Sequence, residues 1–511
     1  MTTILYKKEL KMNLSEALDK FYRFQAKLSA YNHATEALYY DGVTVAPKGT
    51  AENRAHALGI LGEESYLIST DPENVELMEY LDLHKDRLDT RQKRAVYLGL
   101  KNAREMKKIP IEEYVAYKEL LVKAEDVWHC AKENNDFAAF CPYLEEIFET
   151  NKRFASYISP DKKPYDHWLN SYEKGLDMEK CDEFFSALKA RIVPLIKRIS
   201  EKPQLSDSCI NGTFPKADQE KLSYKLMALI GLDLDRCGLG ASEHPFTIML
   251  GSHRDVRITT RYDESNFSSS MFSVIHEGGH ALYDGNSDDD LAYTFLDGGV
   301  SMGVHESQSR FYENILGRSR TFIEALFPAL LSIFPEAMKD KSPEDIYRAV
   351  NKVSPSLIRV EADEVTYCLH VMVRYELEKR VMAGELEVKD LPKEWNRLYK
   401  EYLGVDVPTD SEGVLQDSHW AGGCIGYFPS YALGSAYGAQ LLAKMKETVD
   451  VDGCLKSGDF APINAWNRDR IWRHGCTYGS GDLFRMAAEG EFDPSYYTDY
   501  LERKYGELYG I

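Results

Sequence analysis

The spacing of apolar residues predicts helices along most of the chain. Long stretches such as Leu14 to Leu28 and Ile111 to Lys132 repeat apolar side chains about every 3.6 residues, which places them on one face of a helix. The alternation typical of a strand is scarce, and Arg254 to Tyr262 shows it best, because Val256 and Ile258 are β-branched. The pattern predicts an all-α, predominantly helical fold with a small β-hairpin or sheet.

No linker divides the 511 residues into separate units. Length alone favours two or three domains. However, the chain contains no Pro/Ser/Gly-rich linker, low-complexity segment or internal repeat. We therefore predict one domain over residues 1–511, built as two helical lobes that flank a deep cleft.

One predicted helix is apolar on both sides of the polar sequence His276-Glu277-Gly278-Gly279-His280. We expect it to start near Ser268, with Asn266 or Ser265 as its N-cap, and to end at Asp284-Gly285-Asn286. The polar residues would then lie on a helix that is otherwise buried.

The two histidines of this helix are four residues apart, or one turn. Both imidazoles of His276 and His280 can therefore face one point, as two nitrogen ligands of a tetrahedral zinc ion must, with Glu277 beside them to move protons. Gly278 and Gly279 each cost a helix about 1 kcal/mol relative to alanine, which is reasonable where another backbone or a substrate must approach the metal. The alternative is that the histidines serve packing or solvent contact.

A third ligand is expected from a second predicted helix. A catalytic zinc site usually has three protein ligands and one open position. Glu306, in the helical segment Gly303 to Asn314, is predicted to supply the third, with His305 as the competing candidate. Arg310, one turn later, could orient the Glu306 carboxylate. The alternative for Glu306 and Arg310 is an exposed helix pair.

These residues belong to a larger set of segments that resembles the carboxypeptidase Taq family of metallocarboxypeptidases over nearly the whole chain. Seven characteristic segments occur in order: His244-Pro245-Phe246, Asp255-Val256-Arg257-Ile258-Thr259, His276 to His280, His305-Glu306-Ser307-Gln308, Ile358-Arg359-Val360-Glu361-Ala362-Asp363, Gly413 to Trp420 and Gly426 to Gly434. Seven ordered segments are far more specific than one zinc motif.

The resemblance implies His276, His280 and Glu306 as metal ligands and Glu277 as the catalytic acid and base. It also implies a mostly helical fold with a cleft, a homodimer, and removal of C-terminal residues from peptides.

The chain departs from the family pattern at three places. Tyr40 precedes Asp41 where the family usually has Trp, Cys237-Gly238-Leu239-Gly240 replaces a more polar stretch, and Ala421 stands where Ser is common. None of these positions is a proposed ligand, so the departures bear on substrate preference rather than on catalysis.

Recognition of a free C-terminus requires a fixed positive group, and the arginine fork pairs well with a carboxylate. Arg359 is the first candidate, because it follows a plausible helix start at Ser354-Pro355 and lies four residues before Asp363, which could hold it in place. Arg257, between Asp255 and Thr259, is the second. The alternative for each arginine is a structural ion pair.

Tyr427 and Tyr431 lie in a glycine-flanked aromatic segment, where a phenol could donate to the oxyanion that develops during hydrolysis. We predict Tyr427 as catalytic and Tyr431 as a substrate-binding residue. His419, beside Trp420, could donate to substrate or steady a ligand. Each of these side chains could instead be a core residue.

Composition excludes some classes of protein. The net charge of −20 argues against nucleic-acid binding and suits solubility. A negative field would also favour the approach of basic peptides. Nine scattered cysteines without CxxC spacing are typical of reduced thiols, which predicts a cytoplasmic protein. Met1 to Met12 has no apolar run typical of a signal peptide, and no run of about 18 apolar residues predicts a membrane span.

The sequence therefore predicts a metal-dependent carboxypeptidase that acts on peptides with a free C-terminus. We expect one Zn²⁺ per chain, with Co²⁺ or Mn²⁺ as alternatives, because the ligand types accept several divalent ions. Two other classes stay open: a zinc oligopeptide endopeptidase with the same ligands, and a noncatalytic helical scaffold stabilised by its metal.

Overall fold

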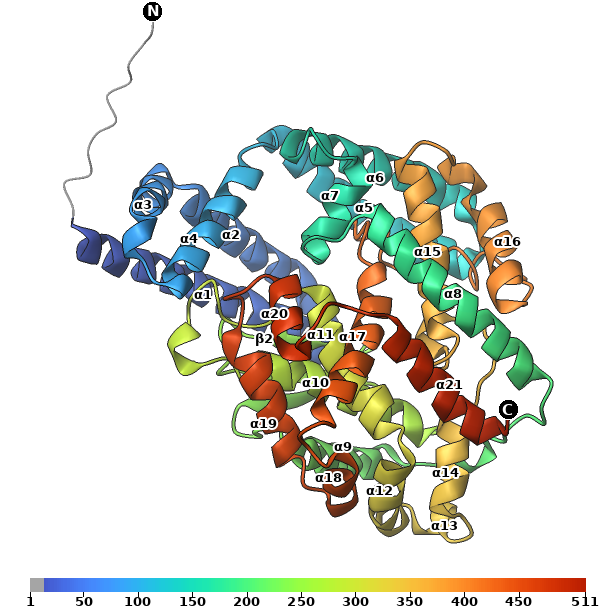
Figure 1. The fold of residues 1–511 in the computed structure, drawn as a ribbon. Coiled ribbons are helices and arrows are strands. Elements are labelled where there is room, and N and C mark those ends of the chain that lie inside the picture. Colours follow the sequence, from blue (N-terminus) through green and yellow to red (C-terminus); the bar gives the residue numbers. More distant parts are fainter. Residues whose placement is uncertain (1–12) are drawn as a thin grey trace, which may run out of the picture.

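Helices make up most of the chain, as predicted. The computed structural model describes residues 13–511, and the segment Met1–Met12, for which we predict no signal peptide, lies outside them. Figure 1 shows the helices packed around a centre formed by α10 (Phe267–Asp284), α11 (Met302–Arg310) and α17 (Pro429–Met445). The predominantly helical fold is confirmed.

The first four helices form a lobe with its own hydrophobic core, separate from the core of the rest. They are α1 (Leu14–Thr44), α2 (Ala51–Thr70), α3 (Pro72–Leu83) and α4 (Thr90–Met106). The amphipathic stretch that begins at Leu14 forms α1, and Asn13 and Glu16 close its N-terminus as a capping box. Leu291 and Leu296 of a later loop complete this core, so the lobe is tied to the body of the molecule.

The remaining helices share the main core. They are α5 (Ile111–Asn134), α6 (Phe137–Ile158), α7 (Pro164–Tyr172), α8 (Met178–Ser200), α9 (Lys216–Ile230), α10, α11, α12 (Arg320–Ile333), α13 (Pro335–Met338), α14 (Pro343–Val350), α15 (Tyr367–Met382), α16 (Leu391–Leu403), α17, α18 (Val451–Ser457), α19 (Ala461–Arg470), α20 (Ser480–Ala488) and α21 (Ser495–Tyr509). The described residues thus form two separate hydrophobic cores, and the division into two lobes around a cleft stays a prediction.

The predicted small sheet has three strands, β1 (Cys237–Ala241), β2 (Thr247–Met249) and β3 (Val256–Thr260), in the order β1-β3-β2. β2 and β3 are antiparallel, as a hairpin requires, whereas β1 runs parallel to β3. The glycine-rich β1 gave no strand signal in the sequence. Its Gly238 lies under the Arg257 side chain, and a Cβ there would lie 2.8 Å from the Arg257 Cδ.

The central helices approach one another closely, and glycines permit it. A Cβ on Gly279 of α10 would lie 2.7 Å from the backbone oxygen of Gln308 in α11. A Cβ on Gly434 of α17 would lie 2.6 Å from the Cβ of Glu306. The expectation that a glycine of α10 admits another backbone is thus met by Gly279. A π-helical turn, Phe311–Gly317, continues α11.

One local prediction is wrong. Ser354-Pro355 does not start a helix, because residues 351–366 are irregular apart from the short turn Arg359–Glu361. Asp363 does not hold Arg359. Its carboxylate accepts hydrogen bonds from the backbone N–H groups of Ser354, Val365 and Thr366, just before α15 begins.

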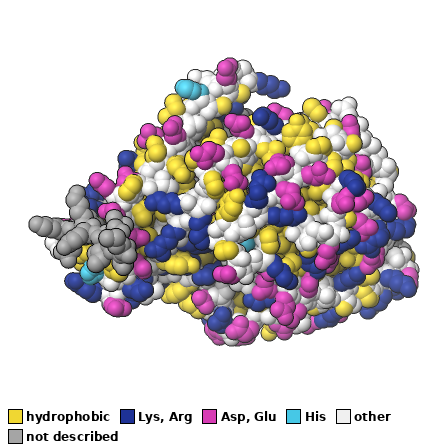
Figure 2. Space-filling view, turned by 90° about the horizontal axis from the view of Figure 1, so that it is seen from above, with side chains coloured by type: hydrophobic (Ala, Val, Ile, Leu, Met, Phe, Trp, Pro, Cys, Tyr) yellow, Lys and Arg dark blue, Asp and Glu magenta, His cyan; other side chains and the backbone are white. Residues whose placement is uncertain are grey.

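The surface mixes charges of both signs. On the face in Figure 2, acidic and basic side chains are interspersed among apolar ones. Among residues 13–511, no helix combines the length and the apolar character that crossing a bilayer demands.

Candidate metal centre and active site

His276, His280 and Glu306 come together at the contact between α10 and α11. One ligand atom from each residue lies within 4.8 Å of the other two. The Nε2 atoms of His276 and His280 lie 3.7 and 3.5 Å from the Glu306 Oε2. These separations are long for hydrogen bonds and suit three ligands arranged around one ion.

His276 is oriented by a carboxylate that sequence reasoning missed. Its Nδ1 donates to the Glu313 Oε2 at 2.8 Å, and Arg318 also donates to Glu313 at 2.9 Å. Burial by itself lowers the pKa of His276, but the carboxylates of Glu306 and Glu313 raise it. Glu313 is seven residues after Glu306, two helical turns, and this spacing was the available signal. The bond leaves the lone pair of Nε2 free for a metal.

His280 is oriented by a second chain of side chains. Its Nδ1 lies 2.7 Å from the Nδ1 of His305, whose Nε2 lies 2.9 Å from the Asp284 carboxylate. Because Nε2 of His305 faces a carboxylate, it donates. Burial alone would lower the pKa of His305, but the Asp284 carboxylate raises it above its ordinary value. His305, the competing ligand candidate, thus contacts the Nδ1 of His280, while the Nε2 of His280 faces Glu306.

Both oxygens of the Glu306 carboxylate are held by hydrogen bonds from its own helix. Arg310 donates from Nε to Oε1 at 2.7 Å, and Ser309 donates to Oε2 at 3.1 Å. Burial alone would raise the pKa of Glu306, but Arg310 and the two histidines outweigh it and keep the carboxylate ionised. Glu306 and Arg310 are both buried or nearly so, which excludes an exposed helix pair.

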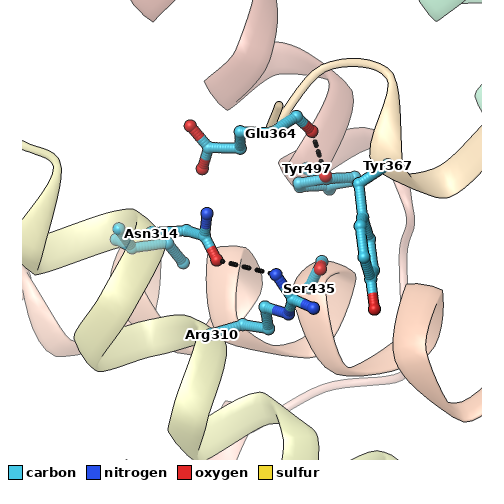
Figure 3. Close-up of a pocket in the computed structure, with 7 residues that line it drawn as sticks. Arg310, Asn314, Glu364, Tyr367, Ser435 and Tyr497 are labelled. Atoms are coloured by element: carbon cyan, nitrogen blue, oxygen red, sulfur yellow. Dashed lines mark hydrogen bonds between the residues drawn. The ribbon is translucent and has the colours of Figure 1, made fainter. Parts of the chain in front are cut away.

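A small cavity lies behind Arg310. Figure 3 shows Arg310 and Asn314 joined by a hydrogen bond (3.3 Å) on one side of it, with Glu364, Tyr367, Ser435 and Tyr497 around the rest. Its volume is about 10 Å³, the space of one water molecule. Arg310 therefore lies between the Glu306 carboxylate and this small cavity.

Glu277 is buried and held by the sheet. Thr247, the first residue of β2, donates from Oγ1 to the Glu277 Oε2 at 2.7 Å and to the Glu277 backbone oxygen at 2.9 Å. Sequence reasoning missed Thr247, although it directly follows the His244-Pro245-Phe246 segment. Through this contact the sheet fixes the position of the carboxylate next to the histidines.

Arg359 is buried in an ion-pair cluster with Asp417 rather than Asp363. Its Nε and Nη2 donate to the same Asp417 oxygen at 3.0 and 2.9 Å, and its Nη1 donates to the Tyr367 hydroxyl at 3.1 Å. Arg374 donates to the other Asp417 oxygen at 2.7 Å. Burial alone would raise the pKa of Asp417, but the two arginines lower it.

Tyr367 links this cluster to the metal residues. The Arg310 guanidinium stacks 4.0 Å from the centre of its ring, while its hydroxyl accepts from Arg359. Sequence reasoning missed Tyr367, because nothing in the surrounding pattern separates it from the other 32 tyrosines.

The predicted aromatic residues gather beside Arg359. Arg359 lies 4.8 Å from the ring centre of Tyr431, and the Tyr431 and Tyr427 rings are 5.1 Å apart, edge to face. His419 forms a hydrogen bond to the Tyr431 hydroxyl through Nε2 at 3.1 Å, and burial with the charge of Arg359 lowers its pKa to about 4. His419 is therefore neutral near pH 7, and it contacts a predicted substrate residue rather than a metal ligand.

Arg257 lies apart from these residues. Thr247 is paired with Ile258 across the strands, so both side chains are on the sheet face toward α10, and Arg257 is on the other face. There it pairs with Asp255 at 2.6 Å and lies 5.7 Å from the Tyr40 ring of α1. Among the described residues, no hydrogen bond or ion pair joins Arg257 to the metal cluster, that is, to His276, His280 or Glu306.

Known proteins resemble this chain in both sequence and fold. The sequence profile of the carboxypeptidase Taq (M32) metallopeptidase family matches residues 20–505. The chain belongs to the M32 family. It is 42% identical to carboxypeptidase 1 of Bacillus subtilis over 96% of this chain and 98% of that protein. It is 36% identical to thermostable carboxypeptidase 1 of Pyrococcus furiosus, over 94% and 96% of the two chains.

Solved structures of M32 enzymes share the fold. The M32 carboxypeptidase of Deinococcus radiodurans superposes with a TM-score of 0.94 at 34% identity, over 97% of this chain and 100% of that one. A Pyrococcus furiosus carboxypeptidase structure gives a TM-score of 0.93 at 35% identity, over 97% and 100%. This M32 protein is therefore a metallocarboxypeptidase, and the resemblance seen in its seven segments is confirmed.

Proposed function

We propose that this metallocarboxypeptidase removes C-terminal residues from peptides with a zinc ion held by His276, His280 and Glu306. The observation that carries the proposal is the pair of Nδ1 contacts. The Nδ1 of His276 contacts Glu313 and the Nδ1 of His280 contacts His305, so it is the Nε2 atoms of both histidines that face the Glu306 carboxylate. Two neutral imidazoles and one carboxylate are a standard hydrolytic ligand set.

One divalent ion per chain fits this donor set, with Zn²⁺ first and Co²⁺ or Mn²⁺ as alternatives. When bound, such an ion supplies a Lewis acid and lowers the pKa of a water molecule toward about 7. Arg310 keeps Glu306 ionised and therefore able to bind a cation.

Glu277 is proposed as the proton carrier. It lies on the helical turn between the two histidines, and Thr247 fixes its Oε2. In this position its carboxylate takes the proton of the attacking water and passes it to the leaving amine. Tyr427 is proposed to donate its phenol to the developing oxyanion.

Arg359 is proposed as the first residue to bind the substrate carboxylate. Of its five N–H donors, three are used by Asp417 and Tyr367, and two are left for a ligand. Tyr431 and His419 adjoin it and would position the last residues of the peptide. Arg257 stays the second candidate. It lies on the opposite face of the sheet from the ligands, which would suit a more distant part of the peptide.

The remaining expectations concern the whole protein. We propose a homodimer of single-domain chains in the cytoplasm, acting on peptides and not on nucleic acid. All nine cysteines are free, as expected in a reducing compartment. The charge of −20 opposes binding to a polyanion.

The deciding experiment compares a peptide with a free C-terminal carboxylate and the same peptide as its C-terminal amide. A carboxypeptidase cleaves the free acid at least about a hundredfold faster, because the buried arginine loses its partner in the amide. Mass spectrometry should show stepwise shortening from the C-terminus that a chelator abolishes. Equal cleavage of acid and amide would favour the endopeptidase alternative.

Glu277→Gln tests the chemistry separately. Its kcat should fall by at least about a thousandfold while the protein retains its metal, since the amide cannot accept a proton. Near-normal turnover with metal bound would exclude Glu277 as the proton carrier. The scaffold alternative predicts that chelation melts the helices, whereas we expect lost activity with circular dichroism largely unchanged.

A further inference from the structure

An open pocket of about 390 Å³ lies where the N-terminal lobe meets the body of the molecule. It is bounded by the first turns of α4, by Lys174 two residues after α7, and by the loop at residues 475–479. Its lining residues are Thr90, Lys93, Arg94, Tyr97, Lys174 and Thr477. None of them belongs to the metal cluster or to the Arg359 cluster.

The pocket gathers three cations without a carboxylate partner. Among the residues that the structure describes, no Asp or Glu oxygen lies within 4.0 Å of a charged nitrogen of Lys93, Arg94 or Lys174. This is unusual in a chain with a net charge of −20. Asp482, on the adjacent helix α20, is paired with Arg485 at 3.7 Å. The positive charge of the pocket is therefore left for an external group.

Arg94 and Lys174 are positioned rather than free. Arg94 donates from Nε to the Cys476 backbone oxygen at 3.0 Å and from Nη2 to that of Tyr478 at 3.4 Å. The guanidinium of Arg94 and the ammonium of Lys174 each lie 5.4 Å from the ring centre of Tyr97. The Tyr97 ring thus attracts both cations, which fixes their positions beside the pocket.

Thr477 supplies an unsatisfied donor at the same place. Its side chain is only 6% exposed, and its Oγ1 has no hydrogen-bond partner. A buried hydroxyl without a partner costs roughly 1–3 kcal/mol, so such groups usually face a ligand or an ordered water. Thr477 lines the pocket in which the cations lie.

We propose that this pocket binds a small multivalent oxyanion of the phosphate type. The fixed fork of Arg94, the ammonium groups of Lys93 and Lys174 and the hydroxyl of Thr477 are together suited to several oxygen atoms on one centre. Such an anion would join α4 of the N-terminal lobe to the loop at residues 475–479. That loop also contacts the lobe through the Cys476 N–H, which donates to the Leu296 backbone oxygen at 2.8 Å.

The first test measures inorganic phosphate binding to the metal-loaded enzyme by calorimetry, against chloride at equal ionic strength. The double variant Lys93→Ala/Lys174→Ala should raise the phosphate Kd by about tenfold or more. The double variant Lys225→Ala/Lys341→Ala removes two exposed, unpaired lysines elsewhere and should leave the Kd unchanged. Absence of phosphate binding, or binding that persists in Lys93→Ala/Lys174→Ala, would overturn the proposal. Phosphate that binds only to the metal ion would still bind to Lys93→Ala/Lys174→Ala, and this outcome would therefore count against the pocket.

Thr477→Val separates a ligand site from a structural role. Its melting temperature without phosphate should stay equal or rise, because an unsatisfied buried hydroxyl is removed, while the upward shift caused by phosphate should shrink. A second experiment uses peptide substrates, because a glutamate carboxylate of the substrate is the other oxyanion that could enter the pocket. If phosphate does not bind, and Lys93→Ala/Lys174→Ala raises KM only for peptides that carry glutamate, the pocket serves substrate carboxylates and the proposal is wrong.

Discussion

The carboxylate of Glu313 illustrates how one side chain outside the metal cluster can set the affinity of the cluster. It accepts the Nδ1 proton of His276 and so determines which ring nitrogen faces the metal. It also pairs with Arg318 at 2.9 Å, so its own orientation is fixed. A substitution of Glu313 should therefore change the affinity for the metal without changing the rate of the chemical step once the metal is bound.

Glu313→Gln should weaken metal affinity by about 10–100-fold, because the amide is a poorer acceptor for His276 and leaves Arg318 without a charge partner. Competition with a chromogenic chelator measures this directly. At saturating metal, kcat should recover most of its normal value. Glu336→Gln, at an exposed carboxylate, is the matched control. An unchanged dissociation constant in Glu313→Gln would show that His276 is oriented by other contacts.

Thr247 contacts Glu277, the proposed proton carrier, rather than a proposed metal ligand. Thr247→Val removes the hydroxyl that fixes the Glu277 Oε2 while keeping the side-chain shape, so kcat should fall by about tenfold with little change in KM. Thr247→Ser keeps the hydroxyl and should restore most of the rate. Metal content should be equal in both variants. A Thr247→Ser enzyme as slow as Thr247→Val would attribute the loss to packing of the methyl group.

At the scale of elements, local pattern predicts some boundaries well and others badly. The helix around His276 was expected to begin near Ser268 with Asn266 or Ser265 as cap, and α10 begins at Phe267 with Asn266 accepting from the Ser268 N–H. Apolar periodicity and a capping residue determine this locally. The segment after Ser354 does not form the helix that Ser354-Pro355 predicts. Instead, the Asp363 carboxylate accepts hydrogen bonds from three backbone N–H groups, including that of Ser354.

The contact between α10 and α11 yields a prediction about two adjacent glycines. A Cβ at Gly279 would meet backbone atoms, the Gln308 oxygen at 2.7 Å and the Ser309 Cα at 2.8 Å, which cannot move without shifting α11. Gly279→Ala should therefore lower stability by about 1–3 kcal/mol, even though alanine favours a helix by about 1 kcal/mol. It should also weaken metal binding, since α11 carries Glu306.

Gly278→Ala is the matched control. Its Cβ would meet the tip of the Ile230 side chain, which can rotate away, so the helix preference of alanine should leave stability equal or higher. Denaturant unfolding of the two variants measures the difference. Equal destabilisation would mean that α10 tolerates no side chain at either position, and the contact with the α11 backbone would not be the specific cause.

At the scale of the whole molecule, the parts of the site that sequence could not predict are those brought together by packing. The sequence predicts the cluster of His276, His280 and Glu306 because helix spacing and a known donor set point to these residues. The partners Asp417 and Thr247 were not, because Asp417 is 58 residues after Arg359 and Thr247 is 30 before Glu277 along the chain. Only the packing of α15, the sheet and the loop before α17 makes them neighbours.

The buried carboxylate of Glu378 shows the same long-range dependence, because it joins three segments. It accepts from the Tyr165 hydroxyl of α7 at 2.8 Å, from the Trp420 indole at 2.7 Å and from the Gly426 N–H at 2.8 Å. The last two belong to the loop that leads to Tyr427. Burial raises the pKa of Glu378 from 4.5 to about 7, and the hydrogen bonds and Arg374 only partly offset this effect.

This raised pKa predicts a pH dependence of stability with a definite sign. As pH rises from 4.5 toward 7, the unfolded carboxyl loses its proton while the folded one keeps it, so the folded state loses stability, on the order of 3 kcal/mol in total. Above that range both forms are ionised and the loss stops. Subtracting the unfolding free energy of Glu378→Gln from that of the natural chain at each pH isolates this contribution. The difference should decline across the range, whereas the same subtraction with Glu336→Gln should stay flat. A flat difference for Glu378→Gln would mean that its three hydrogen bonds fully compensate burial, and Glu378 would then be ionised at neutral pH.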